Sequence, residues 1–233
     1  MVSTVGCGAS SDAPAFFRRR NHAWSLSPHY RLHRWVQFYY GQVKGTPWKW
    51  IDLPALFGKV LAEQNNLIKV RYFTAKVQPT PHDPDVNSRQ DAYFRAIQAH
   101  CPLVEFHYGH FLRHKVSMEN VSPPPPTVKV WKNEEKGSDV NMALHILNDA
   151  WLDAYDCAVI VSNDSDLADS LRLVKAQHNK LIGVITPGAP KRKTSKQLAV
   201  HADFIKPIRT WVLESSQLPN PVPGSNIFKP TSW

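Results

Sequence analysis

Short apolar runs alternate with helical patterns in the second half of the chain, and this alternation constrains the fold most strongly. The runs Cys157–Val161 and Leu181–Ile185 contain no charged residue, which is typical of strands buried on both faces of a sheet. Strands that alternate with helices pair in parallel, because each helix carries the chain back to the starting edge of the sheet. We therefore predict an α/β fold with three layers, in which helices flank a mainly parallel central sheet.

Three helices are predicted around these strands. Before the first run, one apolar stripe repeats at helical spacing: Val140, Ala143, Leu144, Leu147 and Trp151. Between the two runs, Leu167, Leu171 and Val174 predict the second helix. The third helix is expected to start near Ser195, and Asp203–Ile205 is expected to form a last short strand.

The preceding part of the chain shows the same two kinds of element. Asp52 can cap the N-terminus of a helix that has Pro54 in its first turn. The next predicted elements are a strand over 68–77, a helix over 90–99 and a strand over 103–111. Four consecutive prolines then stand between Ser122 and Thr127, so a surface excursion with polyproline character is expected there.

The two ends of the chain lack sustained periodicity. Residues 1–37 are rich in Ser, Pro, Arg and His, and we predict that they are disordered or foreign to the fold. From Pro207 onward the chain is again rich in Pro and Ser, so residues 209–233 are expected to form a loosely ordered tail. The folded domain is therefore predicted to span residues 38–208.

Charge and cysteine content narrow the class of partner and the compartment. The formal net charge of +9 favours polyanionic partners, with nucleic acid as the first candidate, although excess lysine also serves solubility alone. The three cysteines have no zinc-site spacing, and their odd number fits a reducing cytosol better than a disulfide framework. Apolar stretches fall short of the roughly 20 residues that a membrane helix needs. A cytoplasmic protein without membrane contact is expected.

Two acidic segments are the candidates for chemistry. Lys136–Val140 places Asp139 at the start of a predicted helix, and Ser162–Asp166 places Asp164 and Asp166 directly after a buried strand. Ligand sites of open α/β sheets lie beyond the carboxyl ends of the strands, so we expect both segments at one edge. A divalent cation relieves the repulsion between such carboxylates, and oxygen ligands favour Mg²⁺ or Mn²⁺. Such an ion can polarise a phosphodiester and activate water.

Other interpretations of these segments remain open. Asn, Asp and Ser are ordinary turn and helix-cap residues, and each segment taken alone is more often a cap than a metal site. A calcium-binding EF-hand is excluded, because Asp169 and Lys175 stand where its loop needs Gly and Glu. A phosphatase of the haloacid-dehalogenase kind is disfavoured, because Ala168 stands where its motif has Thr or Val.

A known family combines these features in the same order. The segment KGSDVNMALHILNDAWLDAYDCAVIVSNDSDL, residues 136–167, closely resembles NYN domains of the LabA-like group, and shorter similarities cover roughly 38–208. The resemblance implies a PIN-like nuclease fold and metal-dependent cleavage of RNA. It also implies that Asp139, Asp164 and Asp166 are the catalytic and metal-binding acids, with Ser162 and Asn163 along the same edge.

The chain departs from this family at the first strand, which in the family ends in I-D-G-x-N and supplies a principal metal ligand. The matching residues Tyr30–Gln37 contain no acid, and Arg34 stands at the place of the Asp. Codons for these residues, shifted by one base, can encode T-V-Y-I-D-G-F-N, so we hypothesise that residues 1–37 are translated out of frame. The alternative to a ribonuclease is therefore a catalytically impaired RNA-binding or regulatory module.

Basic and aromatic residues are candidates for contact with RNA. Lys191, Arg192 and Lys193 follow a predicted strand beside the acids and suit a phosphate backbone, although a solvated lysine-rich turn is an equal alternative. Lys136 can contact phosphate or pair with Asp139. Bases could stack on any of three tryptophans, for which packing is the favoured interpretation: Trp48, Trp50 and Trp131. A homodimer is possible.

Overall fold

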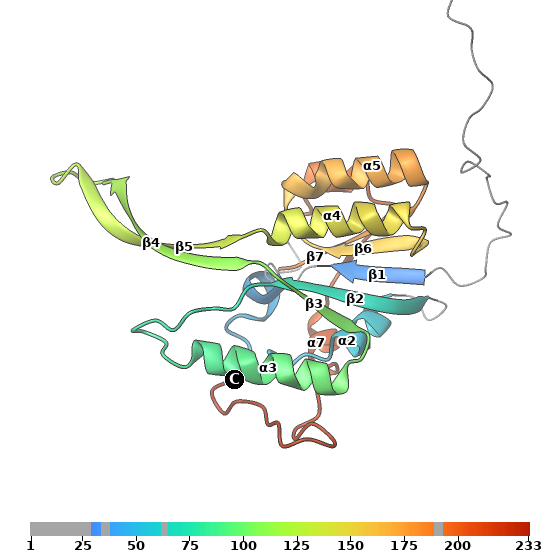
Figure 1. Cartoon of the computed structure of the whole chain (residues 1–233), viewed down its shortest axis with the longest axis horizontal. Coiled ribbons are helices and arrows are strands. Elements are labelled where there is room, and N and C mark those ends of the chain that lie inside the picture. The colour runs from blue at the N-terminus through green and yellow to red at the C-terminus, as the bar shows by residue number, and fades with distance from the viewer. Residues whose placement is uncertain (1–28, 34–37, 62–64, 189–192) are drawn as a thin grey trace, which may run out of the picture.

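A parallel sheet forms the central layer of the protein. The structure is a computed structural model that describes residues 29–33, 38–61, 65–188 and 193–233. The sheet has six strands in the order β3-β2-β1-β6-β7-β8, and every neighbouring pair is parallel (Figure 1). Its strands are β1 (His29–His33), β2 (Asn66–Thr74), β3 (Val104–Tyr108), β6 (Cys157–Val161), β7 (Leu181–Thr186) and β8 (Phe204–Pro207). The predicted α/β class with a parallel sheet is confirmed.

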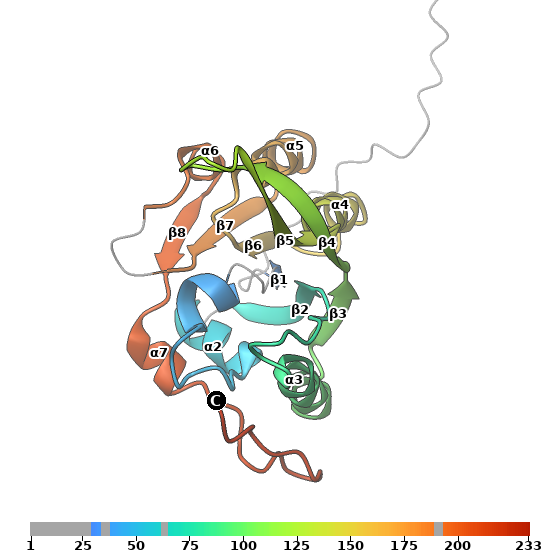
Figure 2. The same cartoon turned by 90° about the vertical axis from the view of Figure 1, so that its left-hand side faces the viewer.

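Helices cover both faces of this sheet (Figure 2). One face carries α4 (Ser138–Trp151), α5 (Ala168–His178) and α6 (Lys196–Ala199). The other carries η1 (Tyr39–Val43, a π-helical turn), α2 (Leu53–Val60), α3 (Val86–His100) and α7 (Thr210–Glu214). Alternate residues of β2 enter different cores, since Tyr72 packs on the α3 side and Phe73 on the α4 side. Three layers result, as predicted. No helix within the described residues is long and apolar enough to cross a membrane.

The strand β1 occupies the centre of the sheet, between β2 and β6. Its backbone register pairs Tyr30 with Cys157 and His33 with Ile160. The segment that was predicted to be disordered or out of frame therefore contains a central strand, so the prediction of disorder is wrong for His29–His33, while the out-of-frame origin stays a hypothesis. A parallel sheet leaves backbone groups of both neighbours unpaired if its central strand is missing, which explains why this segment is used. Residues 34–37, with Arg34, lie outside the described residues.

The predicted helix is confirmed as α4, but its apolar stripe is only partly covered, because Ala143 and Leu147 pack against the core while the other three residues are exposed. Val140, Leu144 and Trp151 are 63%, 59% and 72% exposed. The face against the sheet instead buries Ser138, Met142, Ile146, Asp149 and Ala150. This helix has two apolar stripes at helical spacing, and periodicity cannot tell which of them meets the sheet.

A β-hairpin projects from the sheet, and the sequence did not indicate it. Its strands β4 (His110–Glu119) and β5 (Thr127–Lys136) pair antiparallel and extend away from the body (Figure 1). The strand predicted over 103–111 is divided at Gly109, where the chain leaves the parallel sheet. The proline-rich segment lies at the exposed tip of the hairpin, so the predicted surface excursion is confirmed.

The C-terminal segment packs on the body, so the predicted loosely ordered tail is wrong. After α7, Asp52 N donates to Ser216 O at 2.9 Å, and Leu218 N donates to Trp50 O at 2.7 Å. Leu218 and Val222 are buried, and Trp233 makes ring contacts with Trp50 and Tyr93. A few apolar anchors order this segment although Pro and Ser dominate its composition.

Candidate functional site

The two acidic segments lie on neighbouring elements. The helix α4 precedes β6 and runs antiparallel to it, so α4 begins at the edge where β6 ends (Figure 1). Its N-terminus follows Gly137, whose φ of 90° lies in the left-handed region that favours glycine. The short 3₁₀ helix η2 (Ser165–Leu167), which follows β6, contacts α4. Asp139 and the pair Asp164 and Asp166 therefore stand on elements that pack together.

The loop after β6 is ordered by its own side chains. Ser162 is fully buried, and its Oγ accepts a hydrogen bond from Asp164 N at 3.1 Å. Asp164 Oδ1 accepts from Asp166 N at 3.1 Å, so this carboxylate caps η2. An ionised carboxylate has two oxygens that can each accept more than one bond, so capping by Oδ1 is compatible with a second role. Asp166 is exposed at the surface.

Asn163 connects the acidic loop to the basic one. Its Oδ1 accepts from Ser195 N at 2.6 Å, and its Nδ2 donates to Lys193 O at 3.3 Å. The segment that carries Lys193 is thus held beside Asp164, while Lys191 and Arg192 lie outside the described residues. Lys136 forms an ion pair with Glu134, whose carboxylate lies 3.2 Å from its Nζ.

The carboxylates of Asp139, Asp164 and Asp166 do not by themselves form a complete metal-binding site. Within the described parts of the chain, no three His, Cys, Asp or Glu side chains converge closely enough to hold a metal ion. Asp139 is half-buried in the first turn of α4, and Asp164 is half-buried in its loop. Mg²⁺ usually keeps several waters and is bound by one or two carboxylates together with substrate phosphates. The described acids fit binding by one or two carboxylates together with waters and substrate phosphates. They do not form a set of three protein ligands.

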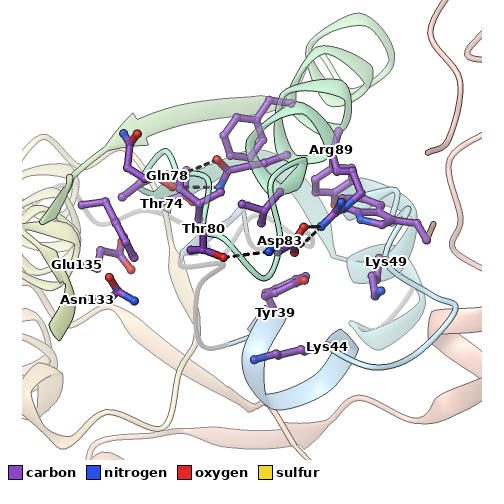
Figure 3. A pocket seen from close by; sticks show the side chains of 18 of the residues that line it. Tyr39, Lys44, Lys49, Thr74, Gln78, Thr80, Asp83, Arg89, Asn133 and Glu135 are labelled. Atoms are coloured by element: carbon purple, nitrogen blue, oxygen red, sulfur yellow. Dashed lines mark hydrogen bonds and ion pairs between the residues drawn. The ribbon is translucent and has the colours of Figure 1, made fainter. Parts of the chain in front are cut away.

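A cavity of about 360 Å³ lies at the base of the β4–β5 hairpin. Its walls are rich in aromatic side chains: Tyr39, Tyr72, Tyr93, Phe94, Phe111 and Trp233. Figure 3 shows Asn133 and Glu135 of β5 on one side and Lys49 and Arg89 on the other. Glu135 also accepts a hydrogen bond from Ser138 Oγ, which links the cavity to the residue before Asp139.

Several separate segments build this cavity, so the sequence analysis missed it. The wall residues come from η1, β2, α3, the hairpin and the C-terminal end, which no local pattern relates. The adjacent pair Tyr93 and Phe94 in α3 is the part of the aromatic wall that stands together in the sequence.

A buried ion-pair network supports α4 from the sheet. Arg71 donates to both carboxylate oxygens of Asp149, at 2.8 and 3.0 Å, and to Glu105 at 3.1 Å. Its Nη1 also lies 3.0 Å from His107 Nε2. Burial, together with the nearby His145, lowers the pKa of His107 to about 4, so the ring is neutral at pH 7 and Nε2 can accept from Arg71. The sequence analysis did not identify this network, because its members come from β2, β3 and α4.

Comparison with known proteins gives the family of this chain. The NYN domain family matches residues 39–208. The 6-hydroxy-3-succinoylpyridine 3-monooxygenase HspA of Pseudomonas putida is 34% identical, over 84% of this chain and 72% of that protein. A solved structure of a protein of unknown function from Vibrio parahaemolyticus is similar with a TM-score of 0.49 at 15% identity, over 81% of this chain and 98% of the other.

Membership follows from the family match, which covers most of the chain, and the parallel three-layer architecture agrees with a PIN-like fold. The LabA-like subgroup remains a prediction. By its sequence and its fold, this chain belongs to the NYN domain family, which is nuclease-like.

Proposed function

We propose that this protein hydrolyses phosphodiester bonds of RNA at the edge where β6 ends and α4 begins. The observation that carries the proposal is the meeting of two acidic segments on packed elements, with the Lys193 segment tied to one of them by Asn163. A basic loop beside carboxylates suits a phosphate backbone that approaches a cation. Membership in a nuclease-like family supports the same reaction class.

The residues have distinct roles in this proposal. Asp139, Asp164 and Asp166 are the candidate ligands, of which one or two would hold Mg²⁺ or Mn²⁺ together with waters and phosphate oxygens of the substrate. The bound ion would polarise the phosphodiester and activate water. Ser162 and Asn163 keep the Asp164 loop in place through the hydrogen bonds described above. The phosphate backbone is positioned by four basic residues: Lys136, Lys191, Arg192 and Lys193.

Cleavage of labelled RNA with Mn²⁺ or with EDTA, beside an Asp164→Asn variant, tests this proposal. We expect cleavage that needs the metal and falls at least about 100-fold in the variant, because losing a ligand should exceed the effect of losing an outer partner. Asp169→Asn is the matched control, since Asp169 is exposed in the next helix and pairs only with Arg172 among the described residues. Metal-dependent cleavage that survives Asp164→Asn would contradict the site.

A catalytically impaired RNA-binding module is the alternative within the same family. Two observations favour it. The described residues contain no cluster of three metal ligands, and the sequence Tyr30–Gln37 contains no acid. It predicts RNA binding without cleavage. Replacing Tyr30–Gln37 by T-V-Y-I-D-G-F-N should then create or increase metal-dependent cleavage, because it supplies the carboxylate that Arg34 replaces. Genomic DNA without I-D-G-x-N in the shifted frame would refute the out-of-frame origin of this segment.

A small aromatic substrate is a candidate from another class. The Pseudomonas relative is named for a reaction on a substituted pyridine, and the aromatic cavity here has a size typical of small-molecule sites. Calorimetric titration with 6-hydroxy-3-succinoylpyridine separates this candidate from the first. Binding that is lost in a Tyr39→Ala variant would favour it, and no heat of binding would remove it.

A further inference from the structure

One face of the β4–β5 hairpin carries three basic residues around an exposed tryptophan ring. Directly opposed residues of an antiparallel pair share a face, and the register opposes Lys115 to Trp131 and Ser117 to Lys129. Arg113, opposite Asn133, lies on that same face. We define the hairpin strip as four residues of this face: Arg113, Lys115, Lys129 and Trp131.

The strip presents an aromatic ring flanked by cations. Trp131 is 54% exposed, the guanidinium carbon of Arg113 lies 4.7 Å from its ring centre, and Lys115 Nζ lies 5.0 Å from it. Arg113 Nε is buried and has no hydrogen-bond partner in the part of the chain that the structure describes. The ring lies outside both hydrophobic cores, and more than half of its surface is open to a ligand.

The cations of the strip are not neutralised by carboxylates. None of its three basic residues forms an ion pair with a carboxylate among the described residues. On the opposite face, Lys132 and Lys136 are both paired with Glu134. The strip therefore presents three basic side chains without carboxylate partners among the described residues, whereas both lysines of the opposite face are paired.

The strip runs into the aromatic cavity. The next positions of the same face toward the body are Asn133, Phe111 and Glu135, and all three line that cavity (Figure 3). Glu135 in turn contacts Ser138 at the start of α4. The hairpin thus projects from the body next to the start of α4 (Figure 1), and its base lines the cavity.

We infer that the hairpin strip binds single-stranded RNA and directs it toward the cavity. Bases stack on Trp131, while phosphates pair with Arg113, Lys115 and Lys129. A single strand is required, because a base paired inside a duplex has no free face for a protein ring. This inference deepens the proposed function, on which it rests, by naming the class of RNA that the site receives.

Fluorescence anisotropy with a labelled oligouridine tests the strip on the full chain. EDTA is present, so binding is measured without cleavage. We expect Trp131→Ala to weaken binding at least about fivefold, because a stacked base contributes roughly that factor or more. Lys129→Ala should weaken binding and lower the slope of log affinity against log salt by about 0.7.

Lys132→Ala is the matched control, since it removes the same charge from the opposite face of the same hairpin. It should leave both affinity and salt slope close to those of the unmodified protein, and an RNA duplex should bind more weakly than the single strand. Thermal unfolding of every variant verifies the fold. The proposal that the hairpin strip binds RNA would be overturned if Trp131→Ala bound the oligouridine with unchanged affinity. Equal losses of affinity in Lys129→Ala and Lys132→Ala would overturn it as well. Absence of cleavage in the separate metal assay would count against the proposed hydrolysis only.

Discussion

Arg71 joins the sheet to the helix that carries Asp139. It is 8% exposed, and its partner Asp149 is 1% exposed. The two-pronged contact between them connects β2 to the inner face of α4. A buried ion pair adds little net stability, but removing one partner leaves an uncompensated charge in a medium that solvates it poorly.

Arg71→Met is therefore expected to lower the free energy of unfolding by about 3–5 kcal/mol. Urea denaturation followed by circular dichroism measures this change. The double variant Arg71→Met with Asp149→Leu should recover most of the loss, because it removes the stranded carboxylate as well. If the single variant unfolds at the same urea concentration as the unmodified protein, the pair is not structurally important.

His107 makes stability depend on pH in a defined window. Burial lowers its pKa to about 4 in the folded protein, whereas the unfolded chain titrates near the ordinary value of about 6.5. Between these values the unfolded state binds the proton and the folded state does not, so stability falls as pH falls. The neutral His107 ring therefore leaves the folded protein at full stability above a pH of about 6.5, and this stability is lost progressively as the pH falls toward about 4.

His107→Gln should flatten this part of the stability profile, by at most about 1.4 kcal/mol per pH unit. Denaturant unfolding at several pH values between the two limits measures the slope. The contribution of Glu105 to the pH dependence of stability remains in this variant. Partial burial raises the pKa of Glu105, but Lys69 and Arg71 outweigh this effect and hold the pKa below the usual range. An unaltered slope in the variant would show that His107 titrates normally.

At the scale of elements, the junction of hairpin and sheet positions the start of α4. Gly109 separates β3 from β4, and a Cβ atom at this residue would lie 2.6 Å from Lys136 O and 2.9 Å from Ser138 Oγ. The nearer of these atoms belongs to the backbone and cannot turn aside. The close approach of the two segments therefore requires glycine.

Gly109→Ala should destabilise the protein by about 1–3 kcal/mol, as overpacking typically does, and should reduce activity by displacing the turn before Asp139. Thermal unfolding and the RNA assay measure the two effects. Gly58→Ala is the control, because its Cβ would meet no atom within 4 Å and alanine favours the helix α2. Equal stability of both variants would contradict the tight junction.

Elements differ in how far they could be predicted. The strands β6 and β7 and the helix after Asp52 were predicted almost to the residue, because apolar runs and caps are local signals. The inner face of α4 could not be predicted, because the helix carries two sets of apolar residues at helical spacing, and the face that is buried also holds Asp149, the partner of Arg71 in a distant strand. The hairpin was missed, because its polar strands carry no buried face.

At the scale of the whole molecule, the C-terminal segment completes one core. Residues after α7 cover Trp50 and Tyr93, so the face that carries α2 and α3 is not closed without them. This arrangement makes the segment part of the fold.

Leu218→Ala tests that role. The side chain is 3% exposed, and its truncation should lower the free energy of unfolding by about 2–5 kcal/mol. Leu152→Ala is the matched control, since Leu152 is 64% exposed and its change should stay within about 0.5 kcal/mol. Both are measured by chemical denaturation, and equal values would mean that the segment does not contribute to stability.

The sequence by itself determined the α/β class, the order of most strands and helices, and the two acidic segments that belong to one sheet edge. These features depend on residues close together in the chain, through strand burial, helix caps and the rule that parallel strands end on the same side. Only the tertiary structure decided which face of α4 is buried, that residues 29–33 fill the centre of the sheet, and that the C-terminal segment packs. It also decided that an aromatic cavity and a basic arm adjoin the acidic edge. The physical reason is that such choices depend on contacts between segments far apart in sequence, which local patterns do not record.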